Sequence, residues 1–237
     1  SKRLPKNSNL HLGILNSLRN MNFFEIDPTI DASCNVGGFG IDGPLSTLVG
    51  QSMGNRKKLY FGLVGDLAAF YDMNALGIRH IGNNLRVVLI NNNSGVEFRL
   101  NSTLEPQLKE ETDKFIAARG HYGSMKLWAE SMGFEYMSAT SKEQVLKNID
   151  KFTSPNISEF NRPVLFEVFT ETSDEQDGLN LMRTTNRDPA PSSTDNENAN
   201  TLRSSSAKRM KKTKDTIKKV TPKKIKKIYR VIREREE

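Results

Sequence analysis

Two stretches decide how this chain folds: Gly62-Leu63-Val64-Gly65-Asp66-Leu67 and Asn91-Asn92-Asn93-Ser94-Gly95. Each stretch lies where a hydrophobic run gives way to a turn rich in small or oxygen-bearing residues. In an open α/β sheet, ligands collect at the carboxyl ends of the strands. The two turns therefore predict a ligand site at the ends of two adjacent strands.

Short apolar or β-branched runs on both sides of these turns predict the remaining strands. The predicted strands are Leu10–Ile14, Leu59–Val64, Val87–Ile90, Phe134–Ser138 and Val164–Phe169. Helix-length segments separate them, and the predicted helices are Pro44–Met53, Ala68–Ile81, Ser124–Met132, Lys142–Phe152 and Asp174–Met182. This alternation predicts an α/β fold, a mostly parallel doubly wound sheet with helices on both faces.

The composition divides the chain into three parts. Residues 1–183 form the predicted globular domain, and residues 184–207 read as a polar linker with almost nothing to bury. Residues 208–237 are predicted to form a flexible, basic, amphipathic helical tail. Thr221-Pro222 supplies its helix start, and Ile225, Ile228 and Ile232 recur at helical spacing.

The net charge of +7 belongs to the tail. From Arg203 to Glu237 there are 15 Lys and Arg against 4 Asp and Glu, whereas the rest of the chain holds 20 against 24. The tail is either simply solvated, bound to an anionic membrane surface, or bound to a protein or nucleic-acid partner. Nucleic acid is the unlikely partner because the globular part is net acidic.

The sequence has neither a second cysteine nor a long apolar run, and both facts narrow the class of protein. A single cysteine, Cys34, excludes an internal disulfide and a multi-cysteine zinc site. No run of about 18 apolar residues suggests a membrane span. We therefore expect a cytoplasmic protein, either fully soluble or held peripherally at a membrane by its tail.

The oxygen-bearing side chains at the two predicted strand ends suit a hard divalent cation. Asp66 offers a carboxylate, and the Asn91-Asn92-Asn93 turn offers carboxamide and carbonyl oxygens. Mg2+ takes few protein oxygens and completes its shell with water or substrate phosphates. A helix beginning near Ala68 would add backbone N–H groups that favour a phosphate.

Gly65-Asp66-Leu67 followed by Asn91-Asn92 resembles the Gly-Asp-Gly and Asn-Asn motif of thiamine-diphosphate-dependent enzymes, with leucine in the third place. Gly-Asp-Leu, Asn91-Asn92-Asn93 and the upstream Gly40-Ile41-Asp42-Gly43 are similar to the branch that contains a synthase of the menaquinone pathway. The likeness covers residues 4–183, and it is to the diphosphate-binding domain of these enzymes.

The resemblance implies thiamine diphosphate and Mg2+ as cofactors. By position, Asp66, the side chain of Asn92 and the carbonyl of Ser94 would ligate Mg2+, with Ser94 in place of the usual glycine. That replacement would be strained if the turn required a positive φ at this residue. Gly65, Leu67 and Ala68 would line the diphosphate, and Gly40 and Ile41 would contact the cofactor, Ile41 as an apolar wedge beneath its two rings.

The resemblance also implies that a pyrimidine-binding domain, in the same parent chain or in a separate subunit, completes the active site in a homo-oligomer. We expect the chain to be inactive without that domain, as a piece of a longer enzyme or as one subunit of a split enzyme. No residue of the chain is assigned as catalytic. His121 is either a surface or capping histidine or a proton carrier on the substrate side.

Several residues depart from the branch that the chain resembles. Val36, Phe39 and Met21 stand where that synthase has basic or hydroxyl residues, and Glu97 stands where it is apolar. Three functions stay open: a 2-oxo-acid decarboxylating lyase or transferase close to the synthase; a thiamine-diphosphate enzyme of another pathway, such as polysaccharide biosynthesis; or a non-catalytic scaffold with a membrane-binding tail.

Overall fold

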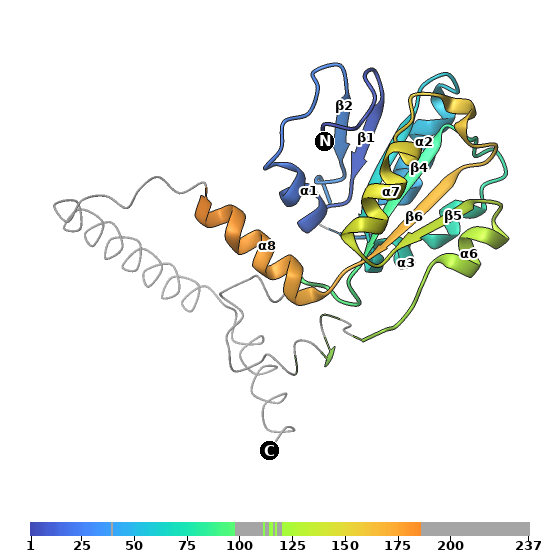
Figure 1. Ribbon diagram of the computed structural model, residues 1–237. Helices are drawn as coiled ribbons and strands as arrows, with labels where there is room; N and C mark the ends of the chain where they lie inside the picture. Colours follow the sequence, from blue (N-terminus) through green and yellow to red (C-terminus); the bar gives the residue numbers. More distant parts are fainter. Residues whose placement is uncertain (39, 98–110, 112–113, 116, 118–119, 186–237) are drawn as a thin grey trace, which may run out of the picture. The chain divides into compact units, whose positions relative to one another are not determined.

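The fold is described from a computed structural model, in which residues 1–38, 40–97, 111, 114–115, 117 and 120–185 are described. Its centre is a six-stranded sheet with the order β2-β1-β3-β4-β6-β5, and all five strand pairs are parallel (Figure 1). The strands are β1 Asn9–Leu12, β2 Asp31–Cys34, β3 Tyr60–Gly65, β4 Leu85–Asn91, β5 Glu135–Ala139 and β6 Val164–Phe169. The predicted doubly wound α/β fold is confirmed.

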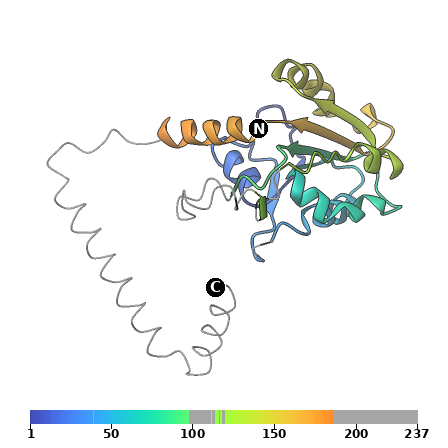
Figure 2. The same cartoon turned by 90° about the horizontal axis from the view of Figure 1, so that it is seen from below.

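Helices cover both faces of the sheet, as Figure 2 shows from below. The described helices are α1 Asn16–Met21, α2 Pro44–Gly54, α3 Asp66–Tyr71, α6 Lys126–Ser131, α7 Lys142–Phe152 and α8 Thr172–Thr185, with short 3-10 helices η1 Met73–Gly77 and η4 Ile157–Glu159. Helices α1 and α2 lie on opposite faces, and the strand order reverses between β1 and β3: β2 lies on one side of β1, and β3 lies on the other. Such switch points are where ligands bind in doubly wound sheets.

Two hydrophobic cores fill the space between the helices and the sheet. On one face, α2, α3, η1 and α6 pack on β3 and β4 through residues such as Leu48, Leu76 and Ala129. On the other face, α1 and α7 pack through Leu18 and Ile149 against a core that contains Phe61 and Phe166. Gly62 in β3 allows α2 to pack closely on the sheet, because a Cβ at this position would lie 2.3 Å from a methyl group of Leu48.

The sequence prediction missed strand β2 and helix α1. Strand β2 is an edge strand that pairs with β1 alone, and its residues are exposed or half-buried. An edge strand of this kind does not need the apolar run that marks a buried one. Helix α1 has only six residues and no fully buried side chain, so its sequence carries no clear helical period.

A single helix over Ala68–Ile81 was also wrong, because the segment is divided into α3 and η1 at Asp72. The backbone of Asp72 leaves the helical region, with φ −117° and ψ 18°. Its carboxylate accepts hydrogen bonds from the backbone N–H of Ser46, at 2.7 Å, and from the Ser46 hydroxyl. Asp72 therefore caps the start of α2, a role that its place inside a predicted helix did not suggest.

The described part of the chain ends inside the predicted linker, since α8 continues to Thr185. Residues 186–237 lie outside the described residues, and with them the rest of the predicted linker and the whole basic tail. Among the helices that are described, none has the length and apolar character needed to cross a membrane.

Candidate cofactor site

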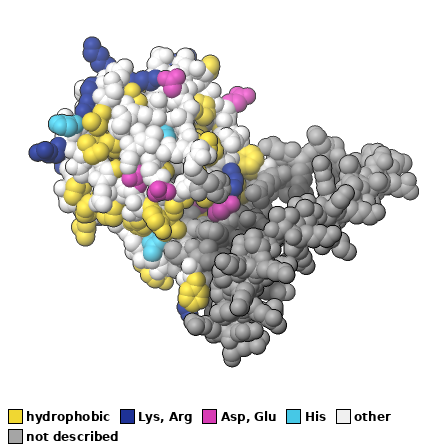
Figure 3. Space-filling model, turned by 180° about the vertical axis from the view of Figure 1, so that it is seen from behind, with side chains coloured by type: hydrophobic (Ala, Val, Ile, Leu, Met, Phe, Trp, Pro, Cys, Tyr) yellow, Lys and Arg dark blue, Asp and Glu magenta, His cyan; other side chains and the backbone are white. Residues whose placement is uncertain are grey.

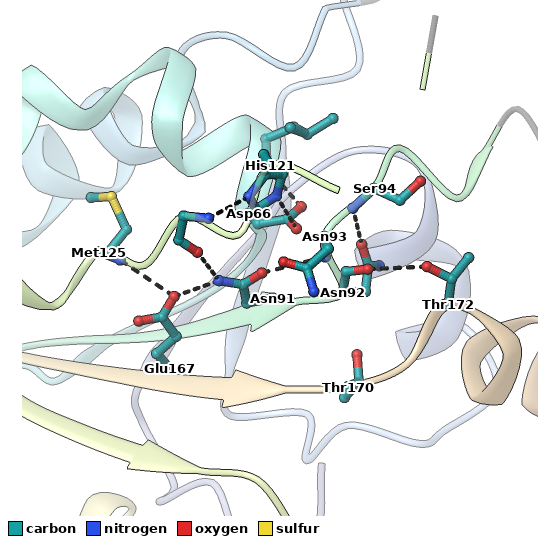
Figure 4. A network of polar contacts seen from close by, with 12 residues as sticks. Asp66, Asn91, Asn92, Asn93, Ser94, His121, Met125, Glu167, Thr170 and Thr172 are labelled. Atoms are coloured by element: carbon teal, nitrogen blue, oxygen red, sulfur yellow. Dashed lines mark hydrogen bonds and ion pairs between the residues drawn. The ribbon is translucent and has the colours of Figure 1, made fainter. Parts of the chain in front are cut away.

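The two sequence turns meet at the carboxyl edge of the sheet. Strands β3 and β4 are hydrogen-bonded neighbours, with Gly65 paired to Ile90. Asp66, which follows β3, therefore lies beside the end of β4, where Asn91 and Asn92 stand. Figure 4 shows their side chains in one network of polar contacts.

Asp66 is a buried carboxylate, with only 2% of the residue exposed. Its Oδ1 atom accepts the backbone N–H of Leu67 at 2.7 Å, and its Oδ2 atom lies 3.0 Å from Nε2 of His121 (Figure 4). A buried carboxylate requires partners of opposite charge or strong donors. In this arrangement His121 occupies the carboxylate oxygen that a bound cation would use.

His121 belongs to the site and not to the surface, because only 18% of its side chain is exposed. Its Nδ1 atom accepts the backbone N–H of Gly123 at 2.9 Å. Since Nδ1 is an acceptor, the ring proton of the neutral form lies on Nε2 and is donated to Asp66. The edge of the Phe70 ring packs on the imidazole, with centroids 5.1 Å apart. His121 is therefore a half-buried partner of Asp66, and its role as a proton carrier stays a prediction.

Asn91 and Asn92 have different partners. Asn91 is fully buried and donates through Nδ2 to the carbonyl of Gly123 and to Oε1 of Glu167. Asn92 donates through Nδ2 to Oε1 of Glu175 at 2.8 Å and accepts the backbone N–H of Ser94 through Oδ1 at 3.0 Å. Asn91 thus holds the site together, whereas the carboxamide oxygen of Asn92 keeps one acceptor position for a ligand.

The turn after Asn92 accommodates serine in place of glycine. Its residue with a positive φ is Asn93, at 60°, and asparagine tolerates this region. Ser94 has no such requirement, so the serine causes no backbone strain here. The Ser94 hydroxyl is buried and has no hydrogen-bond partner within the part of the chain that the structure describes.

Glu167 is a fully buried carboxylate in the middle of β6, and the sequence prediction missed its role. Its Oε1 accepts from Asn91 and from the backbone N–H of Met125, and its Oε2 accepts from the hydroxyls of Ser124 and Tyr136. These contacts fasten residues 123–125, the segment directly after His121, to the end of β4. A glutamate inside an otherwise apolar strand was the one available signal for this role.

Glu175, in the first turn of α8, was also missed. It accepts the Asn92 carboxamide at 2.8 Å and lies 3.2 Å from the Thr170 hydroxyl. Burial raises the pKa of the Glu175 carboxyl, the charge of Asp66 adds to the rise, and the hydrogen bonds from Asn92 and Thr170 oppose it. Four acidic residues crowd the sequence 171–177, so nothing in the sequence distinguished this one.

The predicted cofactor contacts lie around the same edge. Gly65, Leu67 and Ala68 span the end of β3 and the start of α3, and a Cβ at Gly65 would meet no atom within 4 Å. Gly40 and Ile41 are half-buried in the loop before α2. Helix α2, which follows this loop, is tied to the end of α3 by the hydrogen bond from Ser46 to Asp72. Phe39 lies outside the described residues.

An ion pair involves Glu97, one of the residues that depart from the resemblance. Arg19 in α1 contacts Glu97 with both of its terminal nitrogens, at 3.1 Å for Nη2 to Oε1 and closer for Nη1 to Oε2. Nη1 also lies 3.4 Å from Oδ1 of Asn16, whose side chain in turn hydrogen-bonds to Glu175. The pair therefore adjoins the network around Asn92, and each charge is already neutralised by the other.

The residues present fit both expected groups. Asp66 and Asn92 offer hard oxygen ligands, which Mg2+ prefers. Within the described residues no cluster of three or more His, Cys, Asp or Glu could hold a metal ion alone. A cation here would thus depend on amide, carbonyl and phosphate oxygens beside Asp66. The open space beside Gly65 permits a phosphate to approach the backbone closely.

Comparison with known proteins found no matching family model. The chain is 38% identical over 170 residues to a 2-succinyl-5-enolpyruvyl-6-hydroxy-3-cyclohexene-1-carboxylate synthase of Phocaeicola vulgatus, covering 72% of the chain and 29% of the relative. It is 40% identical over 169 residues to the synthase of the same name from Bacteroides thetaiotaomicron, covering 71% and 29%. The chain belongs to the thiamine-diphosphate-dependent family that includes these synthases.

A third relative, the synthase of the same name from Flavobacterium johnsoniae, is 34% identical over 169 residues, again covering 71% of the chain and 29% of the relative. The chain thus spans less than a third of the length of these relatives. Membership of the thiamine-diphosphate family confirms the resemblance that was based on the two sequence turns.

Proposed function

We propose that the chain binds Mg2+ and the diphosphate of thiamine diphosphate at the ends of β3 and β4. The observation that carries the proposal is the burial of Asp66 and Asn92 at the carboxyl ends of the adjacent parallel strands β3 and β4, where each offers a hard oxygen ligand. A carboxylate that is 2% exposed, and whose partners among the described residues are His121 and one backbone N–H, is costly unless a cation compensates it.

When bound, thiamine diphosphate would supply a nucleophilic carbon for chemistry at the carbonyl group of a 2-oxo acid. The chain's own residues bind and orient. Asp66 and Asn92 hold the cation, the backbone at Gly65 lets the diphosphate come close, and Ile41 supports the rings. Glu167 keeps residues 123–125, and with them His121, against the site.

The partner that we propose is a pyrimidine-binding domain, within a homo-oligomer. Large hydrophobic side chains are exposed next to the site: Tyr122, which follows His121, is 88% exposed, and Tyr71 at the end of α3 is 73% exposed. Figure 3 shows hydrophobic side chains gathered on one face of the described domain. Apolar surface of this kind marks an interaction site, and a covering domain would bury it.

The reaction class that we propose is decarboxylation of a 2-oxo acid with transfer of the remaining group, as in the synthases that the chain resembles. A related enzyme of another pathway, acting on a different acceptor, is the second candidate. The pairing of Arg19 with Glu97 favours this alternative, because an arginine already bound to a carboxylate cannot clamp a carboxylate of a substrate.

Calorimetric titration of thiamine diphosphate tests the proposal, in the presence and absence of Mg2+, on the chain combined with a pyrimidine-binding domain. We expect binding that requires Mg2+ and that disappears in Asp66→Asn. The control is Asp150→Asn, which removes an exposed aspartate in α7, paired only to Arg3, and should bind like the wild type. Absence of binding in the wild type would favour the scaffold function.

A further inference from the structure

We propose that Glu175 is a positioning residue that fixes the orientation of the Asn92 carboxamide, so that its oxygen and not its amino group is presented to the cation. The inference rests on the proposed function and adds a residue from α8 to it. Glu175 comes from a part of the chain 83 positions away from Asn92.

The hydrogen bonds of Asn92 leave only one possible orientation of its side chain. Oε1 of Glu175 lies 2.8 Å from Nδ2, and the backbone N–H of Ser94 lies 3.0 Å from Oδ1. A carboxylate only accepts and a backbone N–H only donates. A carboxamide turned by 180° would place oxygen against carboxylate and amino group against N–H, so both bonds would be lost.

The contact is held in place by the turn between β6 and α8. The backbone N–H of Thr170 donates to the carbonyl of Asn91 at 2.9 Å. The Thr172 hydroxyl donates to the carbonyl of Asn92 at 3.0 Å (Figure 4). The Thr170 hydroxyl also contacts Oε1 of Glu175 at 3.2 Å. These bonds hold the turn before α8 against the end of β4. They therefore fix the position of Glu175 relative to the Asn92 carboxamide.

The orientation matters because only one end of a carboxamide can ligate a cation. The oxygen has two acceptor positions, and the Ser94 N–H uses one of them. The amino group has no free electron pair to offer and carries a partial positive charge. Without Glu175, both orientations of Asn92 become accessible, and part of the population presents the wrong end.

The test is the Mg2+ concentration that gives half-maximal binding of thiamine diphosphate, measured at saturating cofactor on the chain with its pyrimidine-binding domain. Glu175→Ala removes the acceptor and is expected to raise this midpoint by about 10-fold to 100-fold, as for other residues that orient metal ligands. Glu175→Gln keeps a carbonyl oxygen toward Asn92, so its midpoint is expected to stay within about threefold of the wild type.

The matched control is Asp177→Asn, which removes an exposed carboxylate from the same helix and should leave the midpoint unchanged. A second variant, Glu175→Leu, keeps the test decisive if Glu175→Ala does not fold. It also removes the acceptor but fills the partly buried position, so its midpoint is expected to rise as that of Glu175→Ala does.

Three results would overturn the inference. A Glu175→Ala midpoint equal to the wild type would show that Asn92 needs no orienting partner. Equal losses in Glu175→Ala and Glu175→Gln would show that charge and not orientation matters. Absence of Mg2+-dependent binding in the wild type would overturn the proposed function as well, so the two failures are distinguishable.

Discussion

Nε2 of His121 lies 3.0 Å from Oδ2 of Asp66, although the two residues are 55 positions apart in the chain. The contact places an imidazole N–H on the carboxylate oxygen that the proposed cation would take. Because Asp66 is buried, some donor must satisfy it whenever the cation is absent. The histidine thus stabilises the site without metal, and metal binding must displace or realign it.

Replacing His121 with alanine should destabilise the protein only when no cofactor is present. The Asp66 carboxylate would keep a single N–H partner, and an unsatisfied buried acceptor costs about 1–3 kcal/mol in the free energy of unfolding. With Mg2+ and thiamine diphosphate at saturation, the difference from the wild type should shrink. Urea unfolding in both conditions measures it, with His80→Ala, an exposed histidine, as the control. An equal loss in both conditions would contradict the account.

Glu167→Leu should be strongly destabilising. The substitution leaves the buried Asn91 carboxamide and the hydroxyls of Ser124 and Tyr136 without their acceptor. Each buried unsatisfied group costs about 1–3 kcal/mol, so we expect a loss of more than about 3 kcal/mol in the free energy of unfolding. Chemical denaturation measures it. Glu130→Ala, at an exposed position of α6, should change little, and a similarly small effect at Glu167 would refute its anchoring role.

The stability of the protein should fall in alkaline solution through Tyr136. Burial, with the adjacent Glu167 as a further cause, raises the pKa of the Tyr136 hydroxyl from 10.0 to about 12. A raised pKa in the folded state means that the folded form holds the proton more tightly. The contribution to stability is therefore complete below pH 10 and is lost as the pH rises from 10 to about 12.

The difference in unfolding free energy between the wild type and Tyr136→Phe, followed from pH 9 to about 12, isolates this contribution from other groups that titrate there. The difference should diminish across that range. A difference that stays constant with pH would contradict the raised pKa of the Tyr136 hydroxyl in the folded protein.

Glu97→Leu should change which 2-oxo acids the complete enzyme accepts. The substitution releases the Arg19 guanidinium from its ion pair, so that it can bind a second carboxylate on a substrate. A charge-assisted hydrogen bond is worth about 1.5–3 kcal/mol. The KM for dicarboxylic 2-oxo acids should therefore fall by at least about tenfold relative to the KM for monocarboxylic ones. Steady-state kinetics with matched substrate pairs measures the ratio. The exposed control Glu25→Leu should leave it unchanged, and no shift in Glu97→Leu would place Arg19 outside the substrate site.

The sequence was sufficient for the parallel α/β fold class and for placing the turns at Asp66 and Asn92 at one edge of the sheet. Buried strands such as Val164–Phe169 must be apolar on both faces, so they are visible as runs. The turns at Asp66 and Asn92 could be joined because consecutive parallel strands end at the same edge. Edge strand β2 has no such apolar run, because it pairs with one neighbouring strand and its residues are exposed or half-buried.

The contacts that support the site could not be predicted, for a different reason. Glu175 and His121 contact Asn92 and Asp66 from segments that are distant in sequence, through loops whose path no local pattern determines. Their residue types are common at exposed positions as well. Only the three-dimensional neighbours distinguish a glutamate that orients a ligand from the acidic residues beside it in α8.

A crystal structure of the chain with its pyrimidine-binding domain, thiamine diphosphate and Mn2+ in place of Mg2+ would test the central claim most directly. We expect an anomalous peak about 2.1 Å from an oxygen of Asp66 and from Oδ1 of Asn92, with His121 moved from the carboxylate oxygen that it holds here. A peak at another position, or bound cofactor with His121 still on Asp66 and no metal between the two strand ends, would contradict the account.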